Sequence, residues 1–204
     1  MKTTLFLFLS ISLSLVTFAQ KEEPDNEEDF KNRGFKKENL FTGGSVSLGF
    51  SNGTTSLGLI PHFGYSLNKY VDVAVSMNFN YTSQRDNVVL GDKIRQTIIG
   101  PGAFVRLFPV KFLFAQAQYE HNFIKLKYLP ADNSGYVAST ENYNGNSLLV
   151  GAGYSQGRED GNSFYYLSLM FDVAKSKYSP YKDELGRNIP IIRAGLNIAL
   201  FQNR

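Results

Sequence analysis

YVDVAVSMNFNYT, the stretch at residues 70–82, alternates apolar and polar side chains along its whole length. Large apolar residues hold the odd positions from Val71 to Tyr81, and small or polar residues hold the even positions from Asp72 to Asn80. Successive side chains of a β-strand point to opposite faces, whereas a helix would mix the two sets around its circumference. The stretch therefore predicts a strand with one apolar and one polar face.

The same two-residue period recurs along the chain and gives eight candidate strands. Several reach the ~9–11 residues that a tilted strand needs to cross a bilayer, and they exceed the ~5–6 residues of an average soluble strand. We therefore expect an all-β fold, an eight-stranded antiparallel up-and-down transmembrane β-barrel. The candidate strands cover residues 42–50, 55–67, 70–82, 94–108, 111–127, 146–156, 164–176 and 189–202.

The composition narrows the classes of function. The 204 residues include 18 Gly, 12 Tyr and 17 Phe, and charged residues make up 19%, below the usual ~25% of soluble domains. A Cys count of 0 excludes disulfides, thiolate metal sites and a Cys nucleophile within this sequence. The net charge of +3 is too small to indicate nucleic-acid binding.

Alternation alone does not tell which face is outside, because a soluble lipocalin-like barrel keeps its apolar face inside. The polar faces here are mainly Gly, Ser, Ala and Asn, which suit the narrow interior of an eight-stranded barrel. The connections also alternate in length: residues 68–69 and 109–110 are tight, whereas 83–93, 128–145 and 177–188 are long and polar. Short turns at one end and long loops at the other are typical of outer-membrane barrels.

Aromatic residues on the apolar parity are a third indication. They fall near the predicted strand ends, where membrane proteins place aromatic girdles at the two interfaces. We therefore expect the apolar face to contact lipid. The candidate girdle residues are Tyr65, Tyr154 and Tyr165 at one end, and Phe50, Tyr81 and Phe123 at the other.

The N-terminal segment has the form of a secretory signal peptide over residues 1–19. Lys2 precedes an apolar run, and TFA at residues 17–19 offers small side chains for cleavage. Residues 20–40 begin with an acidic run that has almost nothing to bury, which predicts a disordered periplasmic tether. The barrel is expected over residues 41–204, in the outer membrane of a Gram-negative bacterium.

Charged and amide residues on the polar parity are expected inside the barrel. Buried charges are costly unless they are paired. We therefore expect ion pairs between Asp72 and Arg106, on neighbouring strands, and between Asp172 and Arg193, across the last hairpin. The resulting network is expected to fill the lumen and not to conduct ions. Its members are Asp72, Arg106, Gln116, Gln118, Glu120, Asp172 and Arg193.

IPHFGY at residues 60–65 is followed by VDVAV at 71–75, and GPGAFVR stands at residues 100–106. These stretches resemble the second hairpin and the fourth strand of small eight-stranded outer-membrane β-barrel proteins, the family that includes OmpX and the OmpA transmembrane domain. RAGLNIALF at 193–201 is similar to the C-terminal signal read by the barrel-assembly machinery. The resemblance implies that this signal consists of Arg193, Gly195, Ile198, Leu200 and Phe201.

No catalytic, cofactor-binding or metal site is expected. The histidines His62 and His121 lie on candidate strands that are not neighbours, so they form no metal-binding pair. We expect His62 in the interior and His121 near the outer boundary. Lipid A deacylase barrels, which share the general architecture, use a His–Ser pair, and no Ser follows His121 at that spacing. An enzymatic role is therefore disfavoured.

The leading hypothesis is a non-enzymatic barrel that presents its long loops for surface interaction or supports the envelope. Loop 128–145, with Tyr128, Tyr136 and Tyr143 among Asn, Ser and Gly, has a composition suited to recognition. An accessory subunit of an outer-membrane secretion or assembly complex is the alternative; a lipid A-modifying enzyme, a narrow channel and a secreted lipocalin-like binder are disfavoured. The expected partners are outer-membrane lipid, lipopolysaccharide and the barrel-assembly machinery, and the accessory-subunit alternative adds an envelope protein complex.

Overall fold

The computed structural model describes residues 35–51, 54–158, 163–174, 176, 179–181 and 188–201, with side chains described for all of these except 49–51. The chain divides into two compact units, Met1–Lys36 and Lys37–Arg204. The predicted signal peptide, most of the predicted tether and the side chain of Phe50 lie outside the described residues. Among the described residues, no helix combines the length and the apolar character needed to span a membrane.

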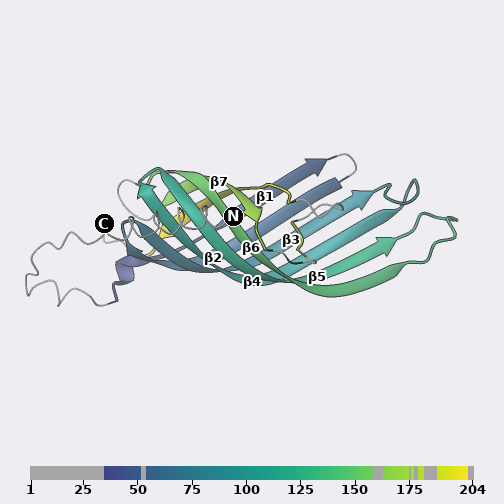
Figure 1. Ribbon diagram of the computed structural model, residues 1–204, viewed down its shortest axis with the longest axis horizontal. Coiled ribbons are helices and arrows are strands. Elements are labelled where there is room, and N and C mark those ends of the chain that lie inside the picture. The colour runs from purple at the N-terminus through teal and green to yellow at the C-terminus, as the bar shows by residue number, and fades with distance from the viewer. Residues whose placement is uncertain are drawn as a thin grey trace, which may run out of the picture. The chain divides into compact units, whose positions relative to one another are not determined.

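Eight antiparallel strands make up the second unit, after a short 3-10 turn, η2 (Lys37–Asn39). Each strand pairs with the next, and β1 also pairs with β8, so the sheet closes into a ring (Figure 1). The predicted eight-stranded antiparallel barrel is therefore confirmed. The strands are β1 (Leu40–Ser51), β2 (Thr54–Asn68), β3 (Val71–Arg85), β4 (Lys93–Val110), β5 (Leu113–Leu129), β6 (Ser139–Gln156), β7 (Phe164–Asp172) and β8 (Ile191–Ala199).

Alternating side chains separate into an apolar outer wall and an interior that combines polar and charged side chains with buried aromatic clusters. In β3, Val75 is 61% exposed and Phe79 is 41% exposed, whereas Asp72 is fully buried. The same alternation of buried and exposed residues runs along β5 and β7. The lipocalin-like arrangement, with its apolar face inside, is therefore wrong for this chain.

The connections differ in length at the two ends of the barrel. Residues 69–70 and 111–112 join strands at what we call the short-turn end, and residues 86–92 and 130–138 join strands at the long-loop end. In Figure 1 the long-loop end lies to the right, where the hairpins of β3 with β4 and β5 with β6 project. These four connections match the predicted alternation, whereas the short connection between β1 and β2 and the longer one at residues 157–163 depart from it, as the sequence also indicates.

One predicted loop is largely strand. β6 begins at Ser139, so Tyr143 lies in β6, Tyr128 lies in β5, and only Tyr136 belongs to the connection. The segment from Ser139 pairs with β5 up to Tyr128. This projecting part of β6 is polar on both faces, so its sequence carries no two-residue period. The prediction of a recognition loop over 128–145 is therefore wrong in its extent.

The last hairpin is also shorter than predicted, because β7 ends at Asp172 and not at residue 176. Arg193 pairs in register with Ser168 and not with Asp172. A long connection does not fix the register of a hairpin as a two-residue turn does. The register of β7 with β8 is thus displaced by four residues from the one that the sequence predicted.

Candidate functional site

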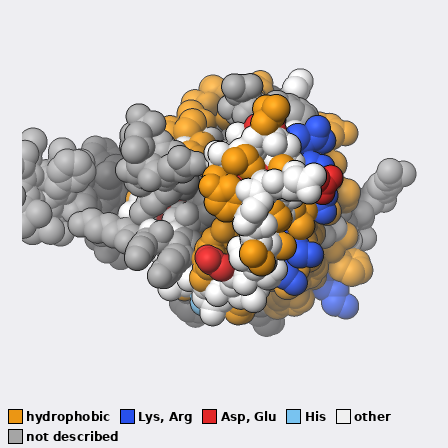
Figure 2. Space-filling view, turned by 90° about the vertical axis from the view of Figure 1, so that its right-hand side faces the viewer, with side chains coloured by type: hydrophobic (Ala, Val, Ile, Leu, Met, Phe, Trp, Pro, Cys, Tyr) orange, Lys and Arg blue, Asp and Glu red, His pale blue; other side chains and the backbone are white. Residues whose placement is uncertain are grey.

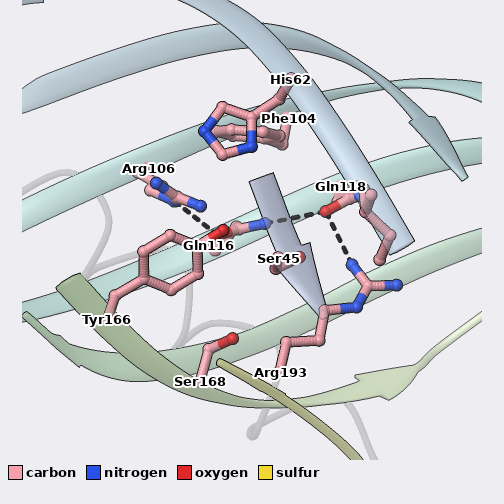
Figure 3. Close-up of a pocket in the computed structure, with 10 residues that line it drawn as sticks. Ser45, His62, Phe104, Arg106, Gln116, Gln118, Tyr166, Ser168 and Arg193 are labelled. Carbon is pink, nitrogen blue, oxygen red and sulfur yellow. Dashed lines mark hydrogen bonds between the residues drawn. The ribbon is translucent and has the colours of Figure 1, made fainter. Parts of the chain in front are cut away.

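The candidate site is the polar network enclosed by the ring. All seven predicted members are buried: Asp72, Glu120 and Asp172 are completely inaccessible, and Arg106, Gln116, Gln118 and Arg193 are nearly so. They come from strands on all sides of the barrel, because inward positions of every strand meet in the narrow lumen. Figure 3 shows part of this network, with Gln116, Gln118 and Arg193 joined by hydrogen bonds.

A line of hydrogen bonds runs along the inner face of β5. Arg106 Nε donates to Gln116 Oε1 at 2.7 Å, and Gln116 Nε2 donates to Gln118 Oε1 at 2.8 Å. Gln118 Nε2 in turn donates to Glu120 Oε1 at 2.8 Å. Gln116, Gln118 and Glu120 are two residues apart on β5, so the two-residue period of the strand places them one after another along the lumen.

Glu120 is the buried anion in the half of the lumen nearer the long-loop end. Arg193 Nη2 lies 3.0 Å from Glu120 Oε1 and forms a buried ion pair with it. The other carboxylate oxygen accepts from the Tyr181 hydroxyl at 2.7 Å and from Asn78 Nδ2 at 3.3 Å. The negative charge is therefore compensated by one cation and by neutral donors, as a buried carboxylate requires.

Tyr181 enters the lumen from the connection between β7 and β8. Its side chain is buried, and it packs with Leu149, Met170 and Ile191. The Tyr181 hydroxyl accepts a hydrogen bond from Asn78 Nδ2 at 3.0 Å. A residue of this connection thus closes part of the barrel interior, although the sequence predicted residues 177–188 to be an outer contact loop.

A second ion pair occupies the half nearer the short turns. Arg158, in the connection after β6, places Nη1 2.7 Å from Asp72 Oδ2. Its guanidinium carbon also lies 3.5 Å from the centroid of the Phe108 ring. Charge pairing and the cation–π contact together hold Arg158 inside the barrel.

The predicted pairing of Asp72 with Arg106 is wrong, although the two residues face each other in the register of β3 and β4. Arg106 instead stacks over aromatic rings, with its guanidinium carbon 4.2 Å from the Tyr166 centroid and 4.5 Å from the Phe104 centroid. Arg158, from the connection after β6, pairs with the Asp72 carboxylate instead.

The predicted pairing of Asp172 with Arg193 is also wrong. The Asp172 carboxylate accepts from the backbone N–H groups of Leu148 and Ala174, both at 2.9 Å, and from the Ser179 hydroxyl. These neutral donors stabilise the buried charge in place of a cation. Asp172 therefore anchors the start of the β7–β8 connection and does not join the ion pair at Glu120.

The network encloses one small cavity that is described in full. It lies beside His62, Arg106 and Arg193 and has room for roughly one water molecule. Figure 3 shows side chains pointing into this cavity from several strands, with the ring of Tyr166 near Arg106. Within the described residues, this volume is too small for a substrate or a cofactor.

The two histidines lie in different environments. His62 is buried, with Nε2 2.8 Å from Asn197 Oδ1 and its ring edge-on to Phe104. His121 is on the outer wall, where Nδ1 lies 2.6 Å from Asn146 Oδ1. Both positions agree with the sequence-based placement. No group of three His, Cys, Asp or Glu side chains within the described residues is arranged to hold a metal ion.

An acidic side chain organises the β3–β4 connection at the long-loop end. The Asp92 carboxylate accepts from the backbone N–H groups of Asn87, Val88 and Val89 and from the Tyr128 hydroxyl. Burial raises the pKa of Asp92, but these hydrogen bonds outweigh it and hold the pKa below the ordinary value of 3.8. The loop therefore has a defined conformation that depends on one ionised carboxylate.

The residues of the predicted assembly signal lie at the end of the ring. Arg193 points inward, and Ile198 is exposed on the outer wall. Gly195 faces Tyr166: an added Cβ would lie 2.4 Å from Tyr166 Cζ. Leu200 and Phe201 follow β8, and the Leu200 backbone N–H donates to Leu40 O at 2.8 Å. Arg193 thus serves the interior network as well as the predicted signal.

No protein-family model matches this sequence, and no curated protein is significantly similar to it. The class of molecule is therefore defined by its fold: a closed eight-stranded antiparallel barrel with buried charged, amide and aromatic side chains inside and an apolar outer wall. The resemblance to small outer-membrane barrels stays a prediction from the sequence.

Proposed function

We propose that this protein is a non-enzymatic integral outer-membrane barrel, exported to the envelope of a Gram-negative bacterium, that presents loops at the cell surface. The observation that carries the proposal is the inverted distribution of side chains. Charged residues such as Asp72 and Glu120 are fully buried, whereas apolar residues such as Val75, Leu59 and Phe123 cover the outer wall.

This distribution is unfavourable in water and favourable in a bilayer. Soluble monomers rarely expose contiguous apolar patches of more than a few hundred Å², whereas hydrocarbon solvates such a wall at no cost. The closed ring supports the same environment, because an open sheet edge would leave backbone groups unpaired in lipid at several kcal/mol each. Tyr81 and Phe123 near one edge of the wall, and Tyr154 and Tyr165 near the other, are suited to the two interfaces.

The filled lumen favours a role at the surface over transport. Eight strands leave an interior just wide enough for side chains, and here two buried ion pairs and several amides occupy it. In planar bilayers we expect no large stable conductance. A stable nanosiemens-scale opening would contradict the filled-barrel proposal.

The long-loop end offers a contact surface. Val88 and Leu90 in the β3–β4 connection, and Tyr136 and Val137 in the β5–β6 connection, are exposed there. Exposed apolar and Tyr side chains of this kind are common in recognition surfaces. The partners we propose are outer-membrane lipid and, during biogenesis, the barrel-assembly machinery.

Two matched substitutions test the membrane environment. Val75→Lys places a charge on the outer wall, and Val88→Lys places the same charge in the β3–β4 connection; both valines are more than half exposed, at 61% and 54%. In lipid vesicles, V75K is expected to destabilise the folded barrel by about 2–4 kcal/mol, whereas V88K is expected to be near neutral.

The readout is heat-modifiable migration on detergent gels and urea unfolding from vesicles. Membrane fractionation of the native chain accompanies it. Recovery of the chain in the soluble fraction, together with equal stability of V75K and V88K, would overturn the proposed function.

A further inference from the structure

Cations gather on the outer wall at the long-loop end of β3, β4 and β5. Four of them, Arg85, Arg95, Lys125 and Lys127, are exposed, and Lys93 is half-buried. All five have the parity of the outward-facing residues on their strands, such as Phe79, Ile99 and Phe123. They therefore point away from the barrel axis and not into the lumen. Figure 2, which views this end, shows Lys and Arg side chains gathered along one side.

The strand register packs these cations closely. Arg95 pairs directly with Lys127 across β4 and β5, and Arg85 pairs directly with Lys93 across β3 and β4. Directly opposite residues on one face have Cβ atoms about 5 Å apart, and like charges in such positions repel. The sheet thus accepts two unfavourable like-charge pairs on one small area.

No acidic side chain occupies the outward positions at these described strand ends. The outward positions of these strand ends hold Ser83, Thr97 and Leu129 besides the cations. Among the described residues, no ion pair involves any of the five cations. Asp86 follows β3 directly, and its carboxylate accepts from the Gly91 backbone N–H at 2.6 Å. The cationic cluster therefore forms no ion pair within the described part of the chain, although Asp86 follows Arg85 directly.

The cluster adjoins the apolar wall and occupies one sector. Lys125 is two residues beyond Phe123 on β5, which is about 7 Å along the strand. The outward positions of β6 at the same level are Thr140, Asn142 and Asn144, opposite Lys127, Lys125 and Phe123. Among the described outward positions of β3 to β6, an amphiphile whose acyl chains lie on the apolar wall would place its polar head beside cations in the β3–β5 sector and beside neutral side chains on β6.

We propose that this cluster, Arg85, Lys93, Arg95, Lys125 and Lys127, binds the phosphate groups of a phosphorylated lipid whose acyl chains pack on the outer wall of β3–β5. The inference rests on the proposed membrane location and adds a ligand class and a site to it. Arg95 and Lys127 donate to the phosphate oxygens, and the negative charge of the phosphate compensates the repulsion between the two cations. Lys125 and Lys93 lengthen the site along the strand direction, so a head group with two phosphates fits better than one with a single phosphate.

The test compares two variants with the same loss of charge. R95Q/K127Q removes the central pair of the cluster, whereas K69Q/K111Q removes two cations from the tight turns at the other end of the barrel. Purified barrels in a neutral detergent are titrated with diphosphoryl lipid A and with its fully dephosphorylated form, and binding is followed by native mass spectrometry. Each basic residue at a membrane surface changes lipid binding by roughly fivefold.

We expect R95Q/K127Q to bind diphosphoryl lipid A at least about tenfold more weakly than the native barrel, and K69Q/K111Q to change binding by less than about twofold. Without lipid, R95Q/K127Q is expected to melt no lower than the native barrel, because the like-charge contact is gone. Equal binding by both variants, or equal binding of the dephosphorylated lipid, would overturn the proposal. If the native barrel inserts into vesicles but shows no preference for the phosphorylated lipid, only the lipid site is overturned. If the chain does not insert into vesicles, the proposed membrane location is overturned.

Discussion

The Arg158 guanidinium hydrogen-bonds both carboxylate oxygens of Asp72, with Nη1–Oδ2 at 2.7 Å and Nη2–Oδ1 at 3.0 Å. The two residues are 86 positions apart in the chain. One belongs to β3 and the other to the connection after β6, so the pair ties this connection to the opposite wall. The bidentate geometry also satisfies both oxygens of a carboxylate that has no access to solvent.

Arg158→Met is expected to destabilise the folded barrel strongly. The substitution leaves the Asp72 charge buried without its cation, which costs about 3–5 kcal/mol when one partner of a buried pair is removed. Urea unfolding in detergent measures the loss. The double variant D72N/R158M is expected to recover a good part of it, since neither charge then remains buried; a double variant as unstable as R158M would contradict the pairing.

Tyr181→Phe tests whether the β7–β8 connection seals the lumen. The variant removes a hydroxyl that lies 2.7 Å from Glu120 Oε2, and a lost buried hydrogen bond of this kind costs about 1–3 kcal/mol. Tyr136→Phe, in the exposed β5–β6 connection, is the matched control and is expected to be neutral. Thermal unfolding of both variants gives the comparison, and equal melting temperatures would count against a sealing role for Tyr181.

Adjacent glycines on β1 should differ in their response to the same substitution. A Cβ at Gly43 would lie 2.1 Å from the backbone O of Leu196, whereas a Cβ at Gly44 would meet nothing nearer than 3.4 Å. We expect Gly43→Ala to cost about 1–3 kcal/mol through overpacking and Gly44→Ala to change stability by less than about 0.5 kcal/mol. Refolding yield and urea midpoints report the difference; equal values would show that β1 and β8 are not in close contact.

The β3–β4 connection is expected to loosen in acid. The pKa of Asp92 is lower in the folded loop than in the unfolded chain, so its ionised form stabilises the loop above the ordinary value of 3.8, and this contribution disappears as the pH falls through the folded pKa. NMR shifts of the Asn87 and Val88 amides are expected to move with a midpoint below 3.8. Asp92→Asn should remove that transition, and a midpoint above 3.8 would contradict the hydrogen-bonded loop.

The two-residue period was sufficient to predict the wall, the interior and all eight strands. It works because the outward parity is apolar along most of each strand, whereas the inward parity carries most of the polar and small side chains. The same period predicted correctly that Asp72 and Arg106 face the interior from neighbouring strands, and the structure places them directly opposite each other. Where both faces are polar, as in β6 from Ser139, the period vanishes, and this first part of β6 was not predicted.

The two-residue period did not predict the side chains that pair with Asp72 and Glu120. Arg158 and Tyr181 lie in connections, where no alternation tells whether a side chain turns inward or outward. Both residues enter the lumen from its ends, so their contacts depend on the three-dimensional course of the chain. One signal in the sequence could have indicated the Asp72 pair. Arg158 lies in the connection that follows β6 at the short-turn end, and Asp72 lies near the same end of β3.

The seam between β1 and β8, from Phe41 opposite Ala199 to Val46 opposite Ala194, has a consequence for biogenesis. A nascent chain that has not yet left the ribosome beyond Ile191 has no strand with which β1 can complete its hydrogen bonds. Contacts between such distant segments form late, because loop closure must precede them. The incomplete polypeptide therefore has to be protected from aggregation until β8 is available. A truncation that deletes β8 should leave a chain that cannot close the barrel and is degraded.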